Sequence, residues 1–542
     1  MQTVRRAGVL LMLPAIGYLL AACDRTEAPT NPRLPPRALL LSNDPTTLWV
    51  NDDDPSGGGF VPPGTSCTHP GYEHVQDAVD DAGPGDRINV CPGTYTEQVT
   101  IPALRKTGIQ LRSVGRWEAI IKAPSVMLAP KAIVRVNGAQ GVTILAFTIS
   151  GPGGIPAGCD ALEYGVRVDD NGSADILGNH ITQIRDEPFS GCQNGVAVQV
   201  GRWAEATTGS ARIMGNVVDN YQKNGVTVDN AGSHAEIVSN RVLGVGPTTL
   251  IAQNGIQASR GATAEIRHNF VSGNVYSPGT VSSTGVLFYG SGAAVTEHNT
   301  LNANDVGAYM FDFVFENGSC GTAAGSTTAY NRARASSFDG IILSGFFPCF
   351  VTGVQVAHNR SDQNSGPGIG VYDAMDNVLD DNGVDNNRDS GILLDDGNNN
   401  TVGDNKVRNN GTADMDLTDG IRVNTNSTDN TIQTNHLKDN VTYDCHDGSV
   451  GTRTAMTANT WIGNHGDTEN KPGLCTKDPT DDATFETSTG WDPGYPWYDS
   501  FGVAVDYDWA TAYAAIDTES LLQLLPQIRL GGIRRAIVSP NE

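Results

Sequence analysis

A repeat constrains this sequence more than any other feature. Its unit is a glycine followed by alternating apolar and polar residues, which is the period of a half-buried strand. The first five copies are spaced 30 residues apart and begin at Gly165, Gly195, Gly225, Gly255 and Gly285. Later copies with less regular spacing begin at Gly307, Gly340, Gly370, Gly391 and Gly420. A recurring period of this size indicates one structural unit stacked on itself.

A second motif lies between the copies of the first: an apolar residue, two others, an asparagine, one other and an apolar residue. Its asparagines are Asn179, Asn216, Asn240, Asn269, Asn405 and Asn435, with looser copies at Asn299, Asn331 and Asn359. Asn and Gly adopt left-handed turns at low cost. Identical Asn side chains on stacked coils can hydrogen-bond as a ladder. The sequence therefore predicts an all-β fold, a parallel β-helix over residues 51–475, whose coils bury a core only by stacking.

The net charge restricts the partners of such a protein. The chain has 542 residues and a formal charge of −25. Nucleic acid and anionic membrane surfaces would be repelled, so we expect no nucleic-acid partner. A cation, or a basic or neutral partner, is easier to accommodate.

The first residues have the pattern of an export signal. Arg5 and Arg6 precede an apolar run, 10–20, that is too short for a settled membrane span. The run ends in Leu-Ala-Ala-Cys at Cys23, which resembles the lipobox of bacterial lipoproteins. The resemblance implies a signal peptide over 1–23, lipidation of Cys23 and membrane attachment through this lipid alone. Ordinary secretory cleavage is the alternative, and both predict an exported protein in the periplasm or at the outer membrane or cell surface.

Two flanking segments lack the repeat. Residues 24–50 contain four prolines between 29 and 36 and no apolar periodicity, which predicts an extended tether. Residues 476–542 contain an aromatic cluster and a short helical pattern over 518–525. We interpret this segment as a C-terminal cap, with a small sugar-binding appendage as the alternative.

Eight cysteines remain beside Cys23. They allow 105 pairings, but in a rod of stacked coils only residues about one coil apart can meet. This favours neighbour pairing, which would join Cys67 with Cys91, Cys159 with Cys192, Cys320 with Cys349 and Cys445 with Cys475. Disulfides imply an oxidising compartment. Metal sites are the alternative, disfavoured because no C-x-x-C occurs.

Residues 67–101 form the predicted N-terminal cap. Val75, Ala78, Val79 and Ala82 lie on one face of a short helix, which could cover the open end of a sheet. The run that follows, Gly-Asp, a strand, Pro-Gly-Thr-Tyr and Glu, resembles the opening of right-handed β-helix proteins of the pectin-lyase-like superfamily. The resemblance implies a right-handed coil. It implies no single activity, because the superfamily includes lyases, hydrolases, epimerases and non-catalytic proteins.

An aromatic alternation breaks the repeat. Tyr309, Phe311, Phe313 and Phe315 fall on one face of a strand. We favour an aromatic stack inside the β-helix. The functional alternative is a platform on which sugar rings stack.

Acidic residues follow the repeat strands, among them Asp169, Asp395 and Asp396. Stacked carboxylates would favour a bound cation or a raised pKa, and calcium is the natural cation for oxygen-rich turns. Asp395 and Asp396 are the preferred metal or acid/base candidates. Solvated turn residues remain the alternative.

Two further groups are candidates. His268 and His298 each precede a ladder asparagine, so stacked coils would place them roughly 5 Å apart, where they could bind a transition metal or supply a base. Surface turn residues are the alternative. Arg167 and Asp169, with Trp203 and Asp229 in nearby copies, could bind an acidic glycan or act in catalysis, although such a mixture also arises by chance.

These observations lead to a functional hypothesis. We expect a cell-envelope β-helix lipoprotein that binds a polysaccharide and processes it as a lyase or epimerase, with glycoside hydrolysis as another enzymatic option. A non-catalytic surface or adhesive rod would show no cluster of perturbed ionisable residues. A periplasmic metal-loading accessory protein would need Met, His and Cys ligands together, and the sequence contains no Met-rich run.

Overall fold

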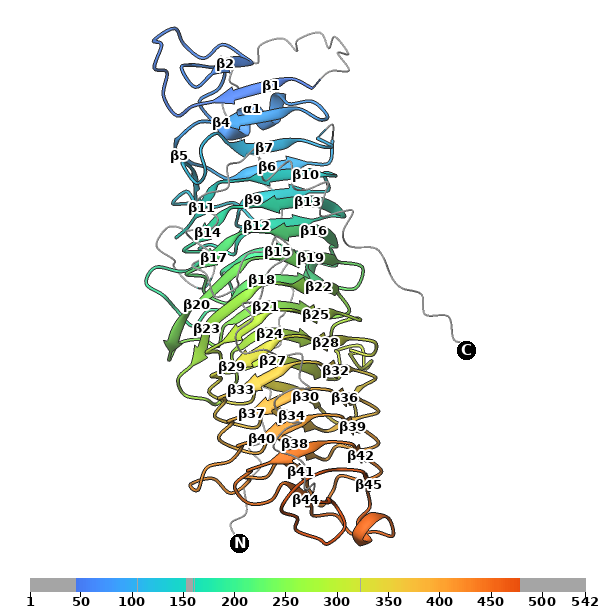
Figure 1. Ribbon diagram of the computed structural model, residues 1–542. Helices are drawn as coiled ribbons and strands as arrows, with labels where there is room; N and C mark the ends of the chain where they lie inside the picture. The colour runs from blue at the N-terminus through green and yellow to red at the C-terminus, as the bar shows by residue number, and fades with distance from the viewer. Residues whose placement is uncertain (1–44, 105, 153–158, 160, 322, 478–542) are drawn as a thin grey trace, which may run out of the picture. The chain divides into compact units, whose positions relative to one another are not determined.

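The computed structural model describes residues 45–104, 106–152, 159, 161–321 and 323–477, and there the chain winds repeatedly through three parallel sheets (Figure 1). Sheet I consists of β1 (Thr47–Val50), β4 (Arg87–Val90), β7 (Gln110–Ser113), β10 (Val142–Leu145), β13 (Gly172–Leu177), β16 (Gly209–Met214), β19 (His234–Val238), β22 (Thr263–Arg267), β25 (Val295–Glu297), β28 (Thr327–Ala329), β32 (Gln355–Ala357), β36 (Val378–Asp380), β39 (Thr401–Gly403), β42 (Thr431–Gln433) and β45 (Thr460–Ile462). Sheet II consists of β5 (Gly93–Thr96), β8 (Ala119–Lys122), β11 (Thr148–Ser150), β14 (His180–Thr182), β17 (Val217–Asp219), β20 (Arg241–Thr248), β23 (Phe270–Tyr276), β26 (Thr300–Asn302), β29 (Arg332–Arg334), β33 (Arg360–Asp362), β37 (Gly383–Asp385), β40 (Lys406–Arg408) and β43 (His436–Lys438). Sheet III consists of β6 (Val99–Pro102), β9 (Ala132–Asn137), β12 (Tyr164–Asp169), β15 (Val196–Val200), β18 (Asn224–Asp229), β21 (Asn254–Ser259), β24 (Thr284–Tyr289), β27 (Val306–Asp312), β30 (Ile341–Gly345), β34 (Ile369–Tyr372), β38 (Ile392–Asp395), β41 (Ile421–Val423) and β44 (Cys445–Asp447).

A few short elements stand outside these sheets. They are the paired strands β2 (Gly64–Ser66) and β3 (His69–Pro70), the pair β31 (Val351–Thr352) and β35 (Ala374–Met375), the helix α1 (Val75–Asp81), and the 3-10 turns η1 (Trp203–Glu205) and η2 (Thr454–Met456).

The strand order confirms the predicted parallel β-helix. The chain passes from sheet I to sheet II to sheet III and then returns to sheet I, where each strand pairs in parallel with that of the preceding coil. Sheet I already begins at Thr47. The predicted boundary at residue 51 is therefore wrong, and residues 47–50 belong to the sheet rather than to the tether.

The helix α1 covers the N-terminal end of the coil, as predicted. Val75, Ala78 and Val79 are fully buried, and the helix contacts β1, β4 and β6. Because β6 is the terminal strand of sheet III, α1 takes the place where another strand would otherwise pair. The carboxylate of Glu97 accepts hydrogen bonds from the backbone amides of Val75 and Gln76, which satisfies two free donors at the start of the helix.

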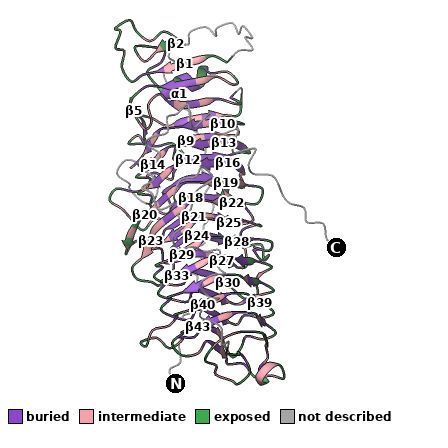
Figure 2. Ribbon diagram, viewed as in Figure 1, coloured by how far each residue is buried: buried purple, intermediate pink, exposed green. Residues whose placement is uncertain are grey.

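Alternate residues of each strand fill a continuous core between the sheets (Figure 2). In sheet III, Val166, Val198, Val226 and Ile256 form one column of paired residues, each with no exposed surface. Burial of such a column in every coil is the main stabilising contribution, because a single coil encloses too little apolar surface.

A continuous asparagine ladder lies at the turn between sheets I and II. At each step the backbone and side-chain amides of one Asn donate to the side-chain oxygen of the next. The ladder consists of Asn179, Asn216, Asn240, Asn269, Asn299, Asn331, Asn359, Asn382, Asn405, Asn435 and Asn464. The predicted ladder is confirmed, and Asn382 and Asn464 extend it.

Two shorter ladders follow the other turns, and the sequence motif did not predict them. One consists of Asn364, Asn387, Asn410 and Asn440. The other consists of Asn377, Asn400, Asn430 and Asn459. Together the ladders pair buried polar groups that would otherwise each cost about 1–3 kcal/mol.

The observed register differs from the predicted repeat at two copies. Val166 pairs with Val198, so Ala197 rather than Gly195 is equivalent to Gly165. Ile341 pairs with Ile369, so Gly368 takes the repeat position instead of Gly370. In both coils the predicted alignment is wrong by two residues, because turns of unequal length change the coil length while the apolar alternation continues.

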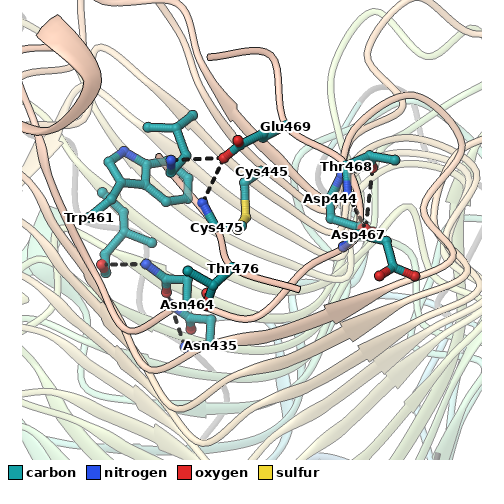
Figure 3. The surroundings of a disulfide bond; sticks show 12 residues. Asn435, Asp444, Cys445, Trp461, Asn464, Asp467, Thr468, Glu469, Cys475 and Thr476 are labelled. Carbon is teal, nitrogen blue, oxygen red and sulfur yellow. Dashed lines mark hydrogen bonds between the residues drawn. A yellow bond between two sulfur atoms is a disulfide. The ribbon is translucent and has the colours of Figure 1, made fainter. Parts of the chain in front are cut away.

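Four disulfides join the eight cysteines in the pairs that the sequence suggested. They are Cys67–Cys91, Cys159–Cys192, Cys320–Cys349 and Cys445–Cys475. The last one ties β44 to the end of the described chain (Figure 3). Beside it, Glu469 accepts the backbone amide of Cys475, and Asn435 donates to Asn464 in the final step of the ladder.

Several predictions lie outside the described residues. These are the signal peptide 1–23 with Cys23, most of the tether 24–50, and nearly all of the C-terminal cap 476–542. Within the described residues, no helix has the length and apolar character needed to cross a membrane.

Candidate functional site

The outer face of sheet III carries side chains that do not repeat from coil to coil. It is formed by the residues that alternate with the core positions and therefore point away from the core. One column contains Arg135, Arg167, Gln199, Thr227, Gln257, Leu287, Tyr309, Ile342, Gly370, Leu393, Arg422 and His446. The adjacent column contains Asn137, Asp169, Asp229, Ser259, Tyr289, Phe311, Ser344, Tyr372 and Asp395.

The first part of this face is an ion-pair zone, formed by Arg135, Arg167, Asp169 and Glu205. Arg167 Nε lies 2.6 Å from Asp169 Oδ2, and Arg135 Nη2 lies 2.9 Å from the same oxygen. Glu205, from η1, binds Arg167 on its other side, and these hydrogen bonds hold the pKa of Glu205 below its ordinary value. Arg167 and Asp169 have no exposed side-chain surface. The structure thus brings the two predicted catalytic candidates together but buries them against each other.

A second set of paired charges continues along the face. Asp229 accepts hydrogen bonds from Arg260 at 2.8 Å, from Ser259 at 2.9 Å and from the backbone amide of Trp203 at 2.9 Å. The guanidinium of Arg260 lies 5.4 Å from the ring centre of Trp203 and 6.0 Å from that of Tyr289. The negative charge of Asp229 is also balanced by a cation, Arg260. Asp229 is therefore positioned to orient the surrounding rings rather than to transfer a proton.

An aromatic zone follows, formed by Tyr289, Tyr309, Phe311, Phe313 and Phe315. The ring centres of Tyr289 and Phe313 are 4.2 Å apart, and those of Phe311 and Phe313 are 5.7 Å apart. All five side chains are half-buried. The preferred prediction of an internal stack is wrong, because Ala308 and Met310 occupy the core positions of β27 and the intervening rings therefore face outward.

An acid–tyrosine zone, defined by Asp339, Tyr372 and Asp395, lies further along the same face. Asp339 directly precedes Gly340 and is 7% exposed. The Tyr372 hydroxyl donates to Asp339 Oδ2 at 2.8 Å. Burial raises the pKa of Asp339 to about 7, although the hydrogen bond from Tyr372 opposes this shift. Burial, reinforced by the nearby Asp339 charge, also raises the pKa of the Tyr372 hydroxyl.

Gly370 makes room for this pair. A Cβ atom at Gly370 would lie 2.4 Å from Asp339 Oδ2 and 2.4 Å from Tyr372 Cε2. The neighbouring coils have Ile342 and Leu393 at the paired positions. The missing side chain leaves a gap between these two residues, and the Tyr372 ring and the Asp339 carboxylate fill it.

Asp395 pairs in register with Tyr372 on the next coil, so both lie on the outer face. Asn424 donates to Asp395 Oδ1 at 2.9 Å, and Arg422 Nε donates to Asn424 Oδ1 at 2.9 Å. Arg422 also binds Asp419, at 2.7 Å. Asp395 is half-buried and hydrogen-bonded by an amide, so of the two carboxylates in the acid–tyrosine zone it is the one with more access to solvent.

The predicted metal candidates do not gather other ligands. Asp396 follows Asp395 in a left-handed turn with φ of 55°. In the described parts of the chain, no three or more His, Cys, Asp or Glu side chains come together as a metal site would require. Calcium binding at Asp395 and Asp396 stays a prediction.

His268 and His298 lie elsewhere, on the turn between sheets I and II. Their ring centres are 5.1 Å apart, close to the predicted spacing, and the stack continues through Tyr330 at 4.9 Å and His358 at a further 4.7 Å. His358 Nδ1 lies 2.8 Å from Asp381. Burial lowers the pKa of His298. The rings are nearly parallel, with 11° between the planes of His268 and His298.

Asp339 and Tyr372 were missed by the sequence reasoning. The sequence pattern predicts Gly370 as a repeat glycine, whereas in the structure it stands where the neighbouring coils have a bulky outward residue. The available signal was Gly368, two residues earlier, which continues the repeat through Gly391. An alignment by that glycine would have placed Tyr372 beside Asp395.

Comparisons with known proteins agree with the fold. A family profile described as "Right handed beta helix region" matches residues 314–467, in agreement with the predicted hand. No match is found among curated proteins by sequence.

Several solved structures are similar at low identity. The periplasmic alginate epimerase AlgG has 12% identity and a TM-score of 0.36, over 74% of this chain and 83% of that one. A lacto-N-biosidase from Eubacterium ramulus has 14% identity and a TM-score of 0.39, over 61% and 67%. A DFA-IIIase from Arthrobacter chlorophenolicus has 14% identity and a TM-score of 0.38, over 71% and 94%.

Proposed function

We propose that this protein binds a polysaccharide along the outer face of sheet III and processes it by lyase- or epimerase-type chemistry at the cell envelope. The observation that carries the proposal is the outward-facing aromatic zone. Tyr289, Phe311 and Phe313 form a half-buried cluster of rings on the face that also bears the ion-pair zone and the acid–tyrosine zone. Rings gathered in this way at a protein surface are typical of binding sites.

The chemistry of the aromatic zone suits a sugar polymer. A pyranose ring has apolar C–H faces and polar edges, so it can stack on an aromatic ring while its hydroxyl groups reach neighbouring polar side chains. Neighbouring coils are spaced roughly 4.8 Å apart. Successive coils therefore offer a regular series of contacts to an extended chain, which favours a polymer over a compact ligand.

The acid–tyrosine zone favours processing over simple adhesion. A non-catalytic rod was expected to have no cluster of perturbed ionisable groups. On this face, burial raises the pKa of Asp339 to about 7 and raises the pKa of Asp389 as well. Perturbed groups beside a ligand-binding surface are typical of active sites.

The cellular location rests on two sequence features and one structural feature. The lipobox at Cys23 and the charged and apolar segments before it imply export and lipid attachment. The four disulfides are typical of proteins that fold in an oxidising compartment. We therefore place the protein in the periplasm or at the outer membrane or cell surface.

The test is binding of the purified protein to a panel of neutral and uronate-containing polysaccharides, with calcium and with a chelator. We expect Phe313→Ala to weaken binding about 10-fold or more, since loss of a stacking ring removes a central contact. Tyr330→Ala is the matched control, because Tyr330 is an exposed ring of the turn between sheets I and II. Equal binding by both variants, or no binding to any glycan, would contradict the proposal.

A further inference from the structure

The acid–tyrosine zone joins a proton donor to an internal proton source. Tyr372 is half-buried, whereas Asp339 behind it is 7% exposed. When Asp339 is ionised, the Tyr372 hydroxyl donates to it, as the 2.8 Å contact shows. When Asp339 is protonated, its own O–H can donate to the Tyr372 oxygen. The phenolic proton is then free to point away from Asp339 toward a ligand.

A proton acceptor lies next to this donor. Asp395 follows Tyr372 in register, on the adjacent strand and in the same outward column. Strands of one sheet are roughly 4.8 Å apart, so the two side chains can reach one ligand. Asp395 has an amide neighbour, Asn424, that donates to one of its oxygens and leaves the other open to accept a proton.

A cation completes the set. Arg422 lies on the coil after Asp395 and is connected to it through Asn424, while Asp419 holds its other edge. A guanidinium in this position can neutralise a carboxylate of the ligand. The donor, the acceptor and the cation therefore come from three successive coils.

We infer that Tyr372 and Asp395 are the catalytic residues of a β-elimination that cleaves a uronate-containing polysaccharide. This inference rests on the proposed function. It specifies the substrate class as an acidic glycan, whose carboxylate Arg422 would neutralise, and it makes Asp339 a positioning residue that acts through Tyr372.

The proposed step balances without a further reactant. Asp395 takes the proton from the carbon next to the uronate carboxylate, and the electron pair of that C–H bond forms a carbon–carbon double bond. The adjacent carbon–oxygen bond breaks, and the departing glycosidic oxygen takes the Tyr372 proton. Tyr372 regains a proton from Asp339. After the products leave, water returns a proton to Asp339 and removes one from Asp395.

Burial is the main cause of the raised pKa of Asp339, and neighbouring groups contribute to it. On the following coils, the charge of Asp389 raises the pKa of Asp339 and the hydrogen bond from Tyr372 lowers it. The Asp339 charge in turn raises the pKa of Tyr309 of β27. The Asp395 charge raises the pKa of Tyr372, and the Arg422 charge lowers the pKa of Asp389. These groups place more acids than cations around Asp339. Turnover should therefore fall as the pH rises above about 7, because the relay requires protonated Asp339.

The test uses the full-length protein and the uronate polysaccharides that bind it, followed by ultraviolet absorbance of the unsaturated product. We expect Tyr372→Phe and Asp395→Asn to bind within about twofold of the wild type and to lose turnover about 100-fold or more. Tyr330→Phe and Asp404→Asn are the matched controls, with an exposed tyrosine and an exposed aspartate on the turn between sheets I and II. Both controls should retain wild-type turnover.

The pH dependence of turnover distinguishes a proton-relay role of Asp339 from a structural one. It is measured on the wild type as well as on a variant, so it does not depend on the folding of one variant. The wild type should lose turnover above about pH 7, and Asp339→Asn should retain a reduced rate without this alkaline limb. An unchanged limb would show that Asp339 does not supply the proton.

Failure of this inference can be distinguished from failure of the proposed function. Binding of uronate polysaccharides without an unsaturated product overturns the elimination. Full turnover by Tyr372→Phe overturns the catalytic role of Tyr372. Both outcomes leave the binding function intact. Binding of neutral glycans alone overturns the substrate class. Absence of binding to every glycan overturns the proposed function and the inference together.

Discussion

Two regions on one face of sheet III surround their buried carboxylates with different partners, cationic in one and neutral in the other. In the ion-pair zone, Asp169 lies between Arg135 and Arg167, and Glu205 binds the far side of Arg167. In the acid–tyrosine zone, Asp339 is equally well buried, but its side-chain partner is the neutral hydroxyl of Tyr372. Arg167 holds the pKa of Glu205 below its ordinary value, whereas burial beside a neutral hydroxyl raises the pKa of Asp339 to about 7.

This difference shows why burial alone does not identify a functional acid. Each region contains a buried acid, Asp169 in one and Asp339 in the other, and both acids lie beside strands of the same sheet. The zones differ in what lies at the next outward position, which is an arginine in one and a glycine in the other. Gly370 removes a side chain where Arg167 supplies a cation to its neighbours.

The largest expected effect tests the structural role of the ion-pair zone. Arg167→Met leaves Asp169 and Glu205 without one cation, and we expect a loss of about 3 kcal/mol in the free energy of unfolding. Arg212→Met is the control, because Arg212 forms an arginine–aspartate ion pair with the more exposed Asp175, on the neighbouring strand of sheet I. Equal losses in thermal denaturation would contradict the view that burial makes the Arg167 pair special.

The next effect tests the proton on Asp339. The pKa of Asp339 is about 7 in the folded protein and close to 3.8 when unfolded. Its contribution to stability is therefore fully present below about pH 4 and is lost as the pH rises through about 7. Asp339→Asn removes this loss, so it should stabilise the protein at about pH 8 by on the order of 3 kcal/mol.

The same substitution should give little or no gain at about pH 3, where Asp339 is mostly protonated in both states. Unfolding temperatures of both proteins at the two pH values would measure the difference. Asp404→Asn, a change of an exposed aspartate, provides the comparison. A gain that did not depend on pH would rule out titration of Asp339 as its cause.

A smaller effect is expected when the gap beside Tyr372 is filled. Gly370→Ala places a Cβ against Tyr372 and the Asp339 carboxylate. We expect a loss of about 1–3 kcal/mol in stability from overpacking and a larger proportional loss of turnover than of glycan binding. Gly383→Ala is a matched control, since a Cβ there meets no atom within 4 Å. Wild-type turnover in Gly370→Ala would argue against the placement of Tyr372.

The smallest effect is expected at the solvent-exposed edge of the ion-pair zone. The Glu205 side chain is 45% exposed, so Glu205→Gln should cost less than about 1 kcal/mol. Turnover should not change, because this zone supplies no proton to the reaction. A large loss of activity would shift the candidate site from Asp339 and Tyr372 to the region of Arg167.

Much of the fold could be predicted from local patterns. The apolar alternation and the Asn motif predicted the parallel coils and the principal ladder, and the face formed by Val75, Ala78 and Val79 predicted the capping helix. These features depend on residues that are close in sequence, and each pattern repeats. The candidate site could not be predicted in the same way. Asp339 and Tyr372 lie 33 residues apart, and the repeat does not specify which side chains of neighbouring coils meet.

By itself, the sequence determined that the chain forms stacked β-coils and where its asparagine ladder lies, because turn conformation and strand burial follow from local composition. Only the tertiary structure decided which residues share a row on the outer face. Coils of unequal length placed Gly368 rather than Gly370 in the repeat, and burial of Ala308 and Met310 left the rings around Phe311 facing outward. The pairing of neighbouring coils sets this register, and no single coil carries enough information to specify it.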